Sequence, residues 1–295
     1  MTSAQKGFRP LFVCGSPKSG TTWLQIILDA HPQIACAGEG HFVEQIVNPL
    51  VSLLRGYNGK LKQVDERVFQ GKAPYQPLAD REIVQMTRDM VVRLMLRQEP
   101  PEGTLWLGDK TPRYTEGLRE LQMLFPGARF IHILRDPRDV AVSRLFHAKR
   151  AGYDDALTVG SETYYELVTN AATAWAAHNG NVERFRTLAA SNAARLHQMG
   201  YERLLGDFDT VVAELFSFLN VTRDEAVIRA IRQATDFERL SGRKHGEEDP
   251  TSFFRKGIVG DWEAHLDGKA LNIIQRHGGE LMRQYGYSGA SGRSR

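Results

Sequence analysis

The sequence predicts a three-layer α/β fold, in which a parallel β-sheet is flanked by helices on both faces. Short apolar segments alternate with amphipathic ones through most of the 295 residues, a pattern typical of parallel strands joined by helices. The first apolar segment, Pro10–Cys14, is followed by a glycine-containing loop and then by helical spacing, which is the order of a P-loop-type unit. No internal repeat or linker is evident, so we expect one domain over residues 1–295 with a helical insertion.

Each predicted strand is a short apolar run that ends at a turn signal, and each predicted helix has apolar residues at helical spacing. Pro10–Cys14 ends at Gly15, and the helix that begins at Thr21 ends before Pro32. The remaining predicted strands are Leu105–Leu107, Ala128–Leu134 and Arg195–Tyr201. The remaining predicted helices are Leu118–Leu124, Asp139–Lys149, Thr163–Ala190, Phe208–Leu219, Asp224–Gln233 and Lys269–Tyr285.

The insertion covers about residues 43–100 and is predicted to be mostly helical. Its clearest helical part is Asp80–Gln98, where apolar residues share one face. The stretch Leu54–Pro77 is polar and carries Gly and Pro, so it is predicted to be a loop. The Gly/Ser-rich end of the chain, residues 288–295, is expected to be a flexible tail.

Composition excludes several classes of protein. Lys and Arg number 38 against 35 Asp and Glu, an even mixture that fits a pocket for an anionic small molecule better than a nucleic-acid surface. Two cysteines rule out a disulfide scaffold or a four-cysteine zinc site and suggest a reducing compartment. No run approaches the ~18 apolar residues of a membrane span, and the N-terminus lacks a signal-peptide pattern. A cytoplasmic location is therefore expected.

The loop after the first strand is suited to an anion. It reads GSPKSGTTW over Gly15–Trp23, and a glycine turn at a helix N-terminus directs backbone N–H groups at a phosphate or sulfate. The Walker A pattern would place Lys directly after the second glycine. Here Thr21 stands there and the lysine is Lys18, although Thr22 could still occupy the Mg²⁺-binding position. An ATP-hydrolysing enzyme of the ordinary kind is disfavoured.

Three segments together resemble the sulfotransferases that use 3′-phosphoadenylyl sulfate (PAPS). PKSGTTW, at Pro17–Trp23, resembles their 5′-phosphosulfate-binding loop. RDPRDVAVS, with Arg135 and Ser143 at its ends, is similar to their 3′-phosphate-binding segment, and RKGIVGDW, at Arg255–Trp262, is similar to their C-terminal segment. Tyr201 begins a weaker match to a segment near the adenine, and a structural tyrosine explains it equally well.

The resemblance implies PAPS as the cofactor, PAP as its product and no requirement for a metal. The residues that it assigns to the cofactor are Pro17, Lys18, Ser19, Gly20, Thr21, Thr22, Trp23, Arg135, Ser143, Tyr201, Arg255, Lys256 and Gly257. Arginine suits phosphate because its planar fork donates two parallel hydrogen bonds, and a serine hydroxyl adds another donor.

The resemblance also suggests four catalytic residues. Lys18 would stabilise charge on the leaving oxygen. Cytosolic members carry a histidine soon after a Lys-Thr pair, but here Pro112 follows the pair. The segment Gly108–Tyr114 instead looks like a segment of the carbohydrate (heparan-type) sulfotransferases, which use a glutamate as the base. That arrangement makes Glu39 the expected base, Lys110 a second cation, and His41 an orienting group or alternative base. The alternative interpretations are a solvated loop acid for Glu39, a surface lysine for Lys110 and a structural histidine for His41.

The predicted activity is transfer of a sulfuryl group from PAPS to a hydroxyl, with an amine as second choice, of a small-molecule or carbohydrate acceptor. The alternatives are an ATP-dependent P-loop kinase and a nucleotide-binding protein without catalysis. We expect no nucleic-acid partner; the oligomeric state is open. The insertion is expected to shape the acceptor site, with Phe42–Gln76 and Gly152–Tyr165 as its loops. Aromatic residues there that could line the acceptor pocket, or simply pack in the core, are Tyr57, Phe69, Tyr75, Tyr153, Tyr164 and Tyr165.

Overall fold

The central element is a five-stranded parallel sheet. The computed structural model describes residues 8–244, 246–252 and 254–287, so the predicted tail at 288–295 lies outside the described residues. The sheet has the order β2-β3-β1-β4-β5, and neighbouring strands are parallel throughout. Its strands are β1 (Arg9–Gly15), β2 (Ile34–Gly38), β3 (Trp106–Lys110), β4 (Arg129–Leu134) and β5 (Leu196–Gly200). The predicted α/β class is confirmed.

Two features of the sheet differ from the prediction. Strand β2 was not expected, because its sequence IACAG is short, rich in small residues and lacks a clear apolar run. Strand β3 starts one residue later and ends three residues later than the predicted Leu105–Leu107, because Gly108, Asp109 and Lys110 are buried strand residues despite their polarity. Both differences place functional candidates at strand ends.

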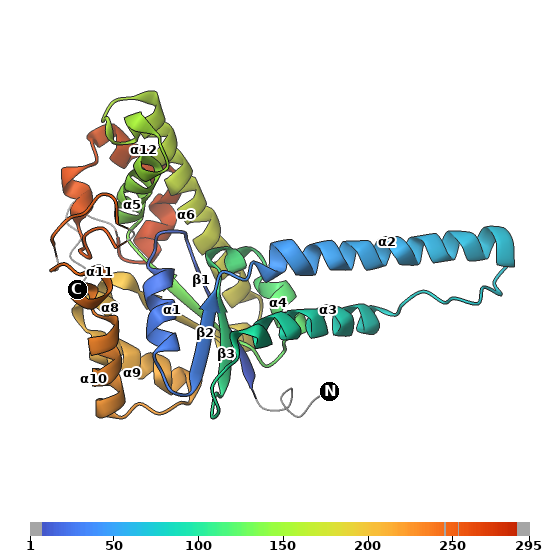
Figure 1. The fold of residues 1–295 in the computed structure, drawn as a ribbon. Helices are drawn as coiled ribbons and strands as arrows, with labels where there is room; N and C mark the ends of the chain where they lie inside the picture. Colours follow the sequence, from blue (N-terminus) through green and yellow to red (C-terminus); the bar gives the residue numbers. More distant parts are fainter. Residues whose placement is uncertain (1–7, 245, 253, 288–295) are drawn as a thin grey trace.

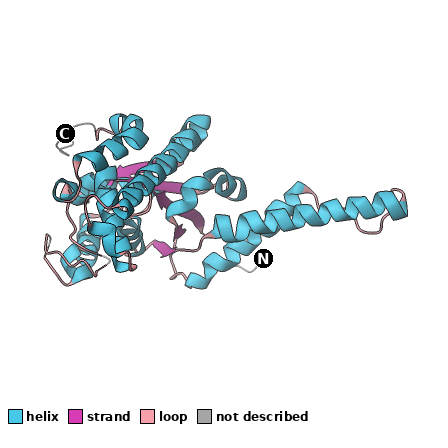
Figure 2. Cartoon of the chain, turned by 90° about the horizontal axis from the view of Figure 1, so that it is seen from above, coloured by secondary structure: helices cyan, strands magenta, loops and turns pink. Residues whose placement is uncertain are grey.

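Helices cover both faces of the sheet, as Figures 1 and 2 show. Alternate side chains of a strand point to opposite faces, so Leu11 and Val13 of β1 lie in one hydrophobic cluster while Phe12 and Cys14 lie in another. His132 of β4 is fully buried and belongs to the core. The helices are α1 (Thr21–Asp29), α2 (Asn48–Val64), α3 (Asp80–Met95), α4 (Leu118–Leu124), α5 (Pro137–Arg150), α6 (Glu162–Leu188), α7 (Ala190–Ala193), α8 (Tyr201–Gly206), α9 (Phe208–Leu219), α10 (Glu225–Thr235), α11 (Phe237–Ser241) and α12 (Gly268–Gln284).

Short helical turns complete the described chain. The π-helical segments are Val43–Val47 and Asp65–Phe69, and the 3₁₀ turns are Leu96–Gln98, Pro112–Glu116, Asp154–Leu157 and Asp261–Ala264. The first face of the sheet packs on α1, α8, α9 and α10, and the second on α3, α4 and α6. A third cluster joins α5, α6 and α12 beside the end of β4.

The insertion forms a two-helix arm that projects from the sheet domain (Figure 1). The prediction of a loop over Leu54–Pro77 was wrong for its first part, because α2 runs to Val64 and a π-helical segment continues to Phe69. Its polarity reflects exposure, since α2 has no buried residue. The Asn58 side chain closes the hairpin: its Nδ2 donates to the Leu78 carbonyl at 2.7 Å, and its Oδ1 accepts from the Leu78 N–H at 2.8 Å.

We expect a Leu→Ala substitution to lower the free energy of unfolding by different amounts in the core and in the arm. Leu24→Ala removes a fully buried side chain of α1 from the first hydrophobic cluster, and we expect it to lower the free energy of unfolding by about 2–5 kcal/mol. Leu53→Ala, on the arm, removes a side chain that is 68% exposed and should change it by about 0.5 kcal/mol or less. Urea denaturation measures both. Equal losses would contradict the assignment of the core.

Candidate active site

The carboxyl ends of four parallel strands meet at one edge of the sheet. In the register, Lys110 at the end of β3 lies opposite Val13 of β1 and Gly38 of β2. On the other side of β1, Gly15 lies opposite Ile133 of β4. The strands therefore deliver the glycine loop, Glu39, Lys110 and Arg135 to the same edge, which is where open α/β sheets bind ligands.

The glycine loop joins β1 to α1 by a tight turn. Gly20 has a φ of 95°, and a Cβ on it would lie 2.6 Å from Cδ2 of Tyr201, so glycine is required on both grounds. Gly20 is also the N-cap of α1, where no side chain caps the helix. The first N–H groups of α1 are thus left for a ligand, and an anion is favoured there.

Arg135 connects the three predicted cofactor segments. Its guanidinium lies 4.3 Å from the centre of the Tyr201 ring. Nη1 donates to the Lys18 carbonyl at 3.4 Å, and Nη2 donates to the Ile258 carbonyl at 3.2 Å. Nε is buried and has no hydrogen-bond partner among the described residues. Segments more than 100 residues apart in the chain therefore converge on one arginine.

The C-terminal segment is held in place by carboxylates. Lys256 Nζ lies 2.7 Å from Asp261 Oδ1, and Arg255 pairs with Asp261 and Glu248. Gly257 has a φ of 66°, and a Cβ there would lie 2.5 Å from the Phe237 ring. These contacts fix the backbone of the segment against its neighbours.

The second and third cofactor segments are joined directly. Asp139, at the start of α5, accepts hydrogen bonds from the N–H groups of Gly260 at 2.8 Å and Trp262 at 3.2 Å. Burial raises the pKa of Asp139, whereas Arg135 and these two N–H donors oppose the rise. A buried acceptor with two backbone donors is a strong structural link.

All but one of the predicted cofactor residues line a single cavity of about 710 Å³. The exception is Ser19, whose buried hydroxyl has no partner in the described part of the chain. Tyr201 lies edge-on to Trp23 at 5.7 Å, and Trp23 Nε1 donates to the Thr235 carbonyl at 2.9 Å. The predicted cofactor residues found in the lining are Pro17, Lys18, Gly20, Thr21, Thr22, Trp23, Arg135, Ser143, Tyr201, Arg255, Lys256 and Gly257.

Several other lining residues carry no signal in the sequence. Leu205, Phe237 and Leu240 of α8 and α11 add apolar surface to the lining. These short helices contain no sequence motif that indicates a binding site. Their place beside the cavity is seen only in the structure, where Phe237 of α11 packs against Gly257.

Glu39, which lines the cavity, forms an ion pair with Lys110, which is not itself among the lining residues. Lys110 Nζ lies 2.5 Å from Glu39 Oε1 and 3.3 Å from Thr22 Oγ1. The Lys110 side chain is only 5% exposed, so it is not a surface lysine, while that of Glu39 is 43% exposed. A Cβ on Gly38 would lie 3.0 Å from Lys110 Cε, so the glycine makes room for the lysine side chain.

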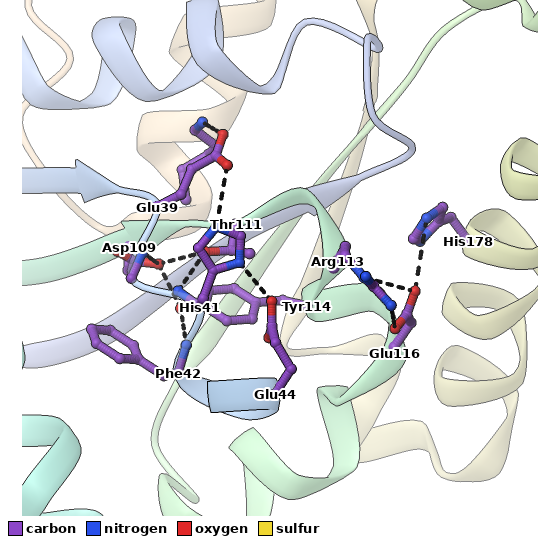
Figure 3. Close-up of polar contacts among 12 residues, drawn as sticks. Glu39, His41, Phe42, Glu44, Asp109, Thr111, Arg113, Tyr114, Glu116 and His178 are labelled. Atoms are coloured by element: carbon purple, nitrogen blue, oxygen red, sulfur yellow. Dashed lines mark hydrogen bonds and ion pairs between the residues drawn. The ribbon is translucent and has the colours of Figure 1, made fainter. Parts of the chain in front are cut away.

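His41 lies between two carboxylates (Figure 3). Its Nδ1 is 2.6 Å from Glu44 Oε1, and its Nε2 is 3.5 Å from Glu39 Oε2. Glu44 therefore orients the imidazole, whose far nitrogen faces the predicted base. The structure brings Glu39, His41 and Lys110 together, and their catalytic roles stay predictions.

Asp109 is a site residue that sequence reasoning missed. Its buried carboxylate accepts from the Gly40 N–H at 3.0 Å, from Thr111 Oγ1 at 3.0 Å and from Tyr114 Oη at 2.5 Å. Figure 3 shows Asp109, Thr111 and Tyr114 close to Glu39 and His41. Burial raises the pKa of Asp109, and the three hydrogen bonds oppose that rise. Asp109 thereby anchors the loop that carries Glu39; only its place before Lys110 hinted at this.

Lys18 lies among other positive charges. Its pKa is lowered to about 8 by burial and by the charges of Arg150 and Arg144, with Glu39 acting in the opposite direction. Like charges held this close favour a bound anion, because an anion relieves their repulsion.

The aromatic candidates for an acceptor pocket separate into groups. Tyr153 lines the cavity, whereas Tyr57, Phe69 and Tyr75 are exposed on the arm or its connection. The buried Tyr164 donates from Oη to the His265 carbonyl at 2.9 Å, and the partly buried Tyr165 donates to Asp267 at 2.6 Å. Within the described chain, residues 43–100 do not line the cavity, and their predicted influence on the acceptor stays a prediction.

The described residues contain no helix long and apolar enough to cross a membrane. They also contain no group of three or more His, Cys, Asp and Glu side chains arranged to hold a metal ion.

Fold and cavity together define a class: a P-loop-type α/β protein whose cavity suits a ligand with several negative charges. The sequence model of the sulfotransferase family matches residues 10–225. The chain therefore belongs to the sulfotransferase family, and sulfuryl transfer is the general activity that this membership assigns. The family predicted from Pro17–Trp23, Arg135–Ser143 and Arg255–Trp262 is confirmed.

Individual relatives are distant. An uncharacterized protein of Aquifex aeolicus is 28% identical over 231 residues, which are 75% of this chain and 26% of that protein. Human sulfotransferase 1C2 is 21% identical over 273 residues, covering 87% of this chain and 77% of the human one. Mouse sulfotransferase SULT7A1, solved in complex with PAP, is similar in fold with a TM-score of 0.57, 17% identity and coverage of 95% and 89%.

The glycine loop predicts a test with a matched control. Gly20→Ala places a methyl group against Tyr201, whereas Gly103→Ala has a similar φ of 87° with nothing within 4 Å. Both variants carry the strain of a left-handed alanine, about 1–2 kcal/mol. We expect Gly20→Ala to lose a further ~1–3 kcal/mol of unfolding free energy from overpacking. Denaturant titration measures the difference, and equal losses would contradict the close approach to Tyr201.

Proposed function

We propose that this protein transfers the sulfuryl group of PAPS to a hydroxyl group of a small-molecule or carbohydrate acceptor, with an amine as second choice. The observation that carries the proposal is the convergence of the three predicted cofactor segments on one cavity, whose lining also includes Glu39 of the Glu39–Lys110 pair. The complex of mouse SULT7A1 with PAP, in a similar fold, supports the choice of cofactor.

The residues present fit PAPS. Arg135 Nε and Ser19 Oγ are buried polar atoms without a partner among the described residues, and such atoms are costly unless a ligand or water satisfies them. We assign the 5′ end to the loop Pro17–Trp23 and the 3′-phosphate to Arg135, Ser143 and the segment Arg255–Gly257. Trp23, Tyr201 and Phe237 would hold the adenine between apolar surfaces. PAPS supplies the sulfuryl group and leaves as PAP.

Chemistry at the other end needs a base and fixed positive charge. Glu39 would accept the proton of the acceptor hydroxyl on a carboxylate oxygen, and Lys110 Nζ, hydrogen-bonded to it at 2.5 Å, would hold that carboxylate in place. Lys18 would stabilise the negative charge that grows on the leaving oxygen. His41, oriented by Glu44, would steer Glu39 or replace it as base. No step of this proposal requires a metal.

The base is tested by Glu39→Gln. We expect turnover with PAPS to fall by about 10²–10⁴-fold, because the amide cannot accept the proton, while PAP binding measured by calorimetry stays close to wild type. Glu225→Gln, in an exposed pair with Arg229 on α10, is the matched control and should keep full activity. Near-normal turnover of Glu39→Gln would remove Glu39 from the mechanism, and ATP–Mg²⁺ binding tighter than PAP would favour a kinase.

From the lowered pKa of Lys18 we predict that the protein takes up a proton when PAP binds in alkaline solution. The pKa of Lys18 is about 8 in the free protein, and the phosphates of PAP favour the charged form and raise that pKa. Between the two values, binding must protonate Lys18, so affinity should fall as the pH rises above the free pKa. Calorimetry at about pH 9, where the phosphates of PAP are already fully ionised, should show uptake approaching about one proton in buffers of different ionisation enthalpy. The same uptake in Lys18→Gln would contradict the assignment.

A further inference from the structure

The cavity carries more positive charge than the proposed cofactor residues account for. Among the described lining residues, Glu39 is the single carboxylate. The Lys and Arg side chains in the lining are Lys18, Arg113, Arg135, Arg144, Arg150, Arg255 and Lys256. The proposed function gives Lys18, Arg135, Arg255 and Lys256 to PAPS, which leaves the other three arginines without an assigned ligand.

These three arginines differ in the hydrogen bonds and ion pairs that their guanidinium groups make within the protein. Arg113 pairs with Glu116 at 2.9 Å, as Figure 3 shows. Arg150 Nη1 donates to the Pro250 carbonyl at 3.1 Å. In the described structure, the guanidinium of Arg144 has no hydrogen bond or ion pair with another residue. Arg144 is therefore the arginine whose hydrogen-bonding capacity is left for a ligand.

Helix α5 places Arg144 in the lining of the cavity. Arg144, His147, Ala148 and Ala151, the C-cap of α5, follow one helical face at spacings of three, four and seven residues, and all four line the cavity. The charge of Arg144 also reaches Lys18, His147 and His178: it contributes, after burial and with other nearby cations, to lowering the pKa of each. Tyr153 and Leu167 add apolar wall to the same cavity.

Acidic groups close to this face are engaged elsewhere. Glu39 is held by Lys110, Glu44 by His41, and Glu116 by Arg113. Their negative charge is therefore largely compensated, and none of them pairs with Arg144. A partly enclosed site with one sign of charge selects ligands of the opposite sign.

We propose that the acceptor is itself an anion, with a carboxylate, phosphate or sulfate group that binds Arg144 while its hydroxyl faces Glu39. This inference rests on the proposed function, because it places the acceptor in the sulfotransferase cavity. Arg144 then determines specificity rather than chemistry: its guanidinium fork binds an oxyanion by two parallel hydrogen bonds, and that contact sets which hydroxyl reaches the base.

The experiment compares matched acceptor probes that differ in one charge. Para-hydroxyphenylacetate is paired with para-hydroxyphenylacetamide, and glucuronate with glucose; glucose phosphate separates a phosphate site from a carboxylate site. Each probe is titrated by calorimetry into the protein with and without PAP. For at least one pair we expect the anionic member to bind about tenfold or more tightly, which corresponds to about 1.4 kcal/mol.

Three variants locate the effect. Arg144→Gln should abolish the preference for the anionic probe, and Arg144→Lys should restore part of it, because lysine keeps the charge but loses the fork. Lys149→Gln is the matched control: Lys149 is on the same helix, exposed and paired with Asp154 at 3.3 Å, and it should keep the full preference. PAP affinity should change less than about twofold in all three, well below the tenfold step of 1.4 kcal/mol.

The outcomes separate this inference from the proposed function. Equal binding of the charged and neutral probes to the wild-type protein overturns the inference, even if PAPS supports turnover of a neutral acceptor. Loss of PAP affinity in Arg144→Gln as large as the loss of probe affinity also overturns it, by placing Arg144 in the cofactor site. Failure of PAP to bind, or of any hydroxyl acceptor to be sulfated, overturns the proposed function, while the probe titrations without PAP still report on Arg144.

Discussion

The buried guanidinium of Arg135 is the contact on which the cavity depends. It stacks on Tyr201, donates to the carbonyl of Lys18 in the glycine loop and donates to the carbonyl of Ile258 in the C-terminal segment. Without it, three segments far apart in the chain would lack a common partner. An arginine is suited to this role because it stays charged when buried and offers donors in several directions at once. Its buried Nε has no hydrogen-bond partner among the described residues, so the side chain that joins these segments also keeps a donor available.

The parallel sheet decides where chemistry can occur. Parallel strands end at the same edge, and the register sets Gly38, Val13 and Lys110 side by side. Glu39 and Lys110, 71 residues apart in the sequence, become an ion pair because each follows or ends its strand at that edge. Asp109, one residue earlier on β3, points to the opposite face and fixes Gly40 from below. Neighbouring residues of one strand thus make different contacts: Lys110 pairs with Glu39, and Asp109 holds the backbone of the loop that carries it.

The two-helix arm is stabilised by different contacts from those of the sheet domain. Helix α2 has no buried residue, so it lacks the tertiary packing that supplies most of the stability of helices in proteins. It is stabilised instead by local contacts such as the Asn58 clamp on Leu78. The cavity, by contrast, is enclosed by elements that pack on the sheet or on one another. The charged face of α5 gives it a chemical character that the conserved shape of an α/β fold does not specify.

The sequence by itself determined the fold class, most elements and the three predicted cofactor segments that meet at one cavity, because each of those signals lies within a short contiguous segment. Pro17–Trp23 carries its glycines, its lysine and its helix start in seven residues. Tertiary structure alone decided the rest. Strand β2, too short and small to show a period, is defined by pairing with β3. Asp109 and Arg144 acquire their significance from partners, or from the lack of them, that packing brings close across long stretches of chain, and such long-range proximity leaves no mark in a single sequence.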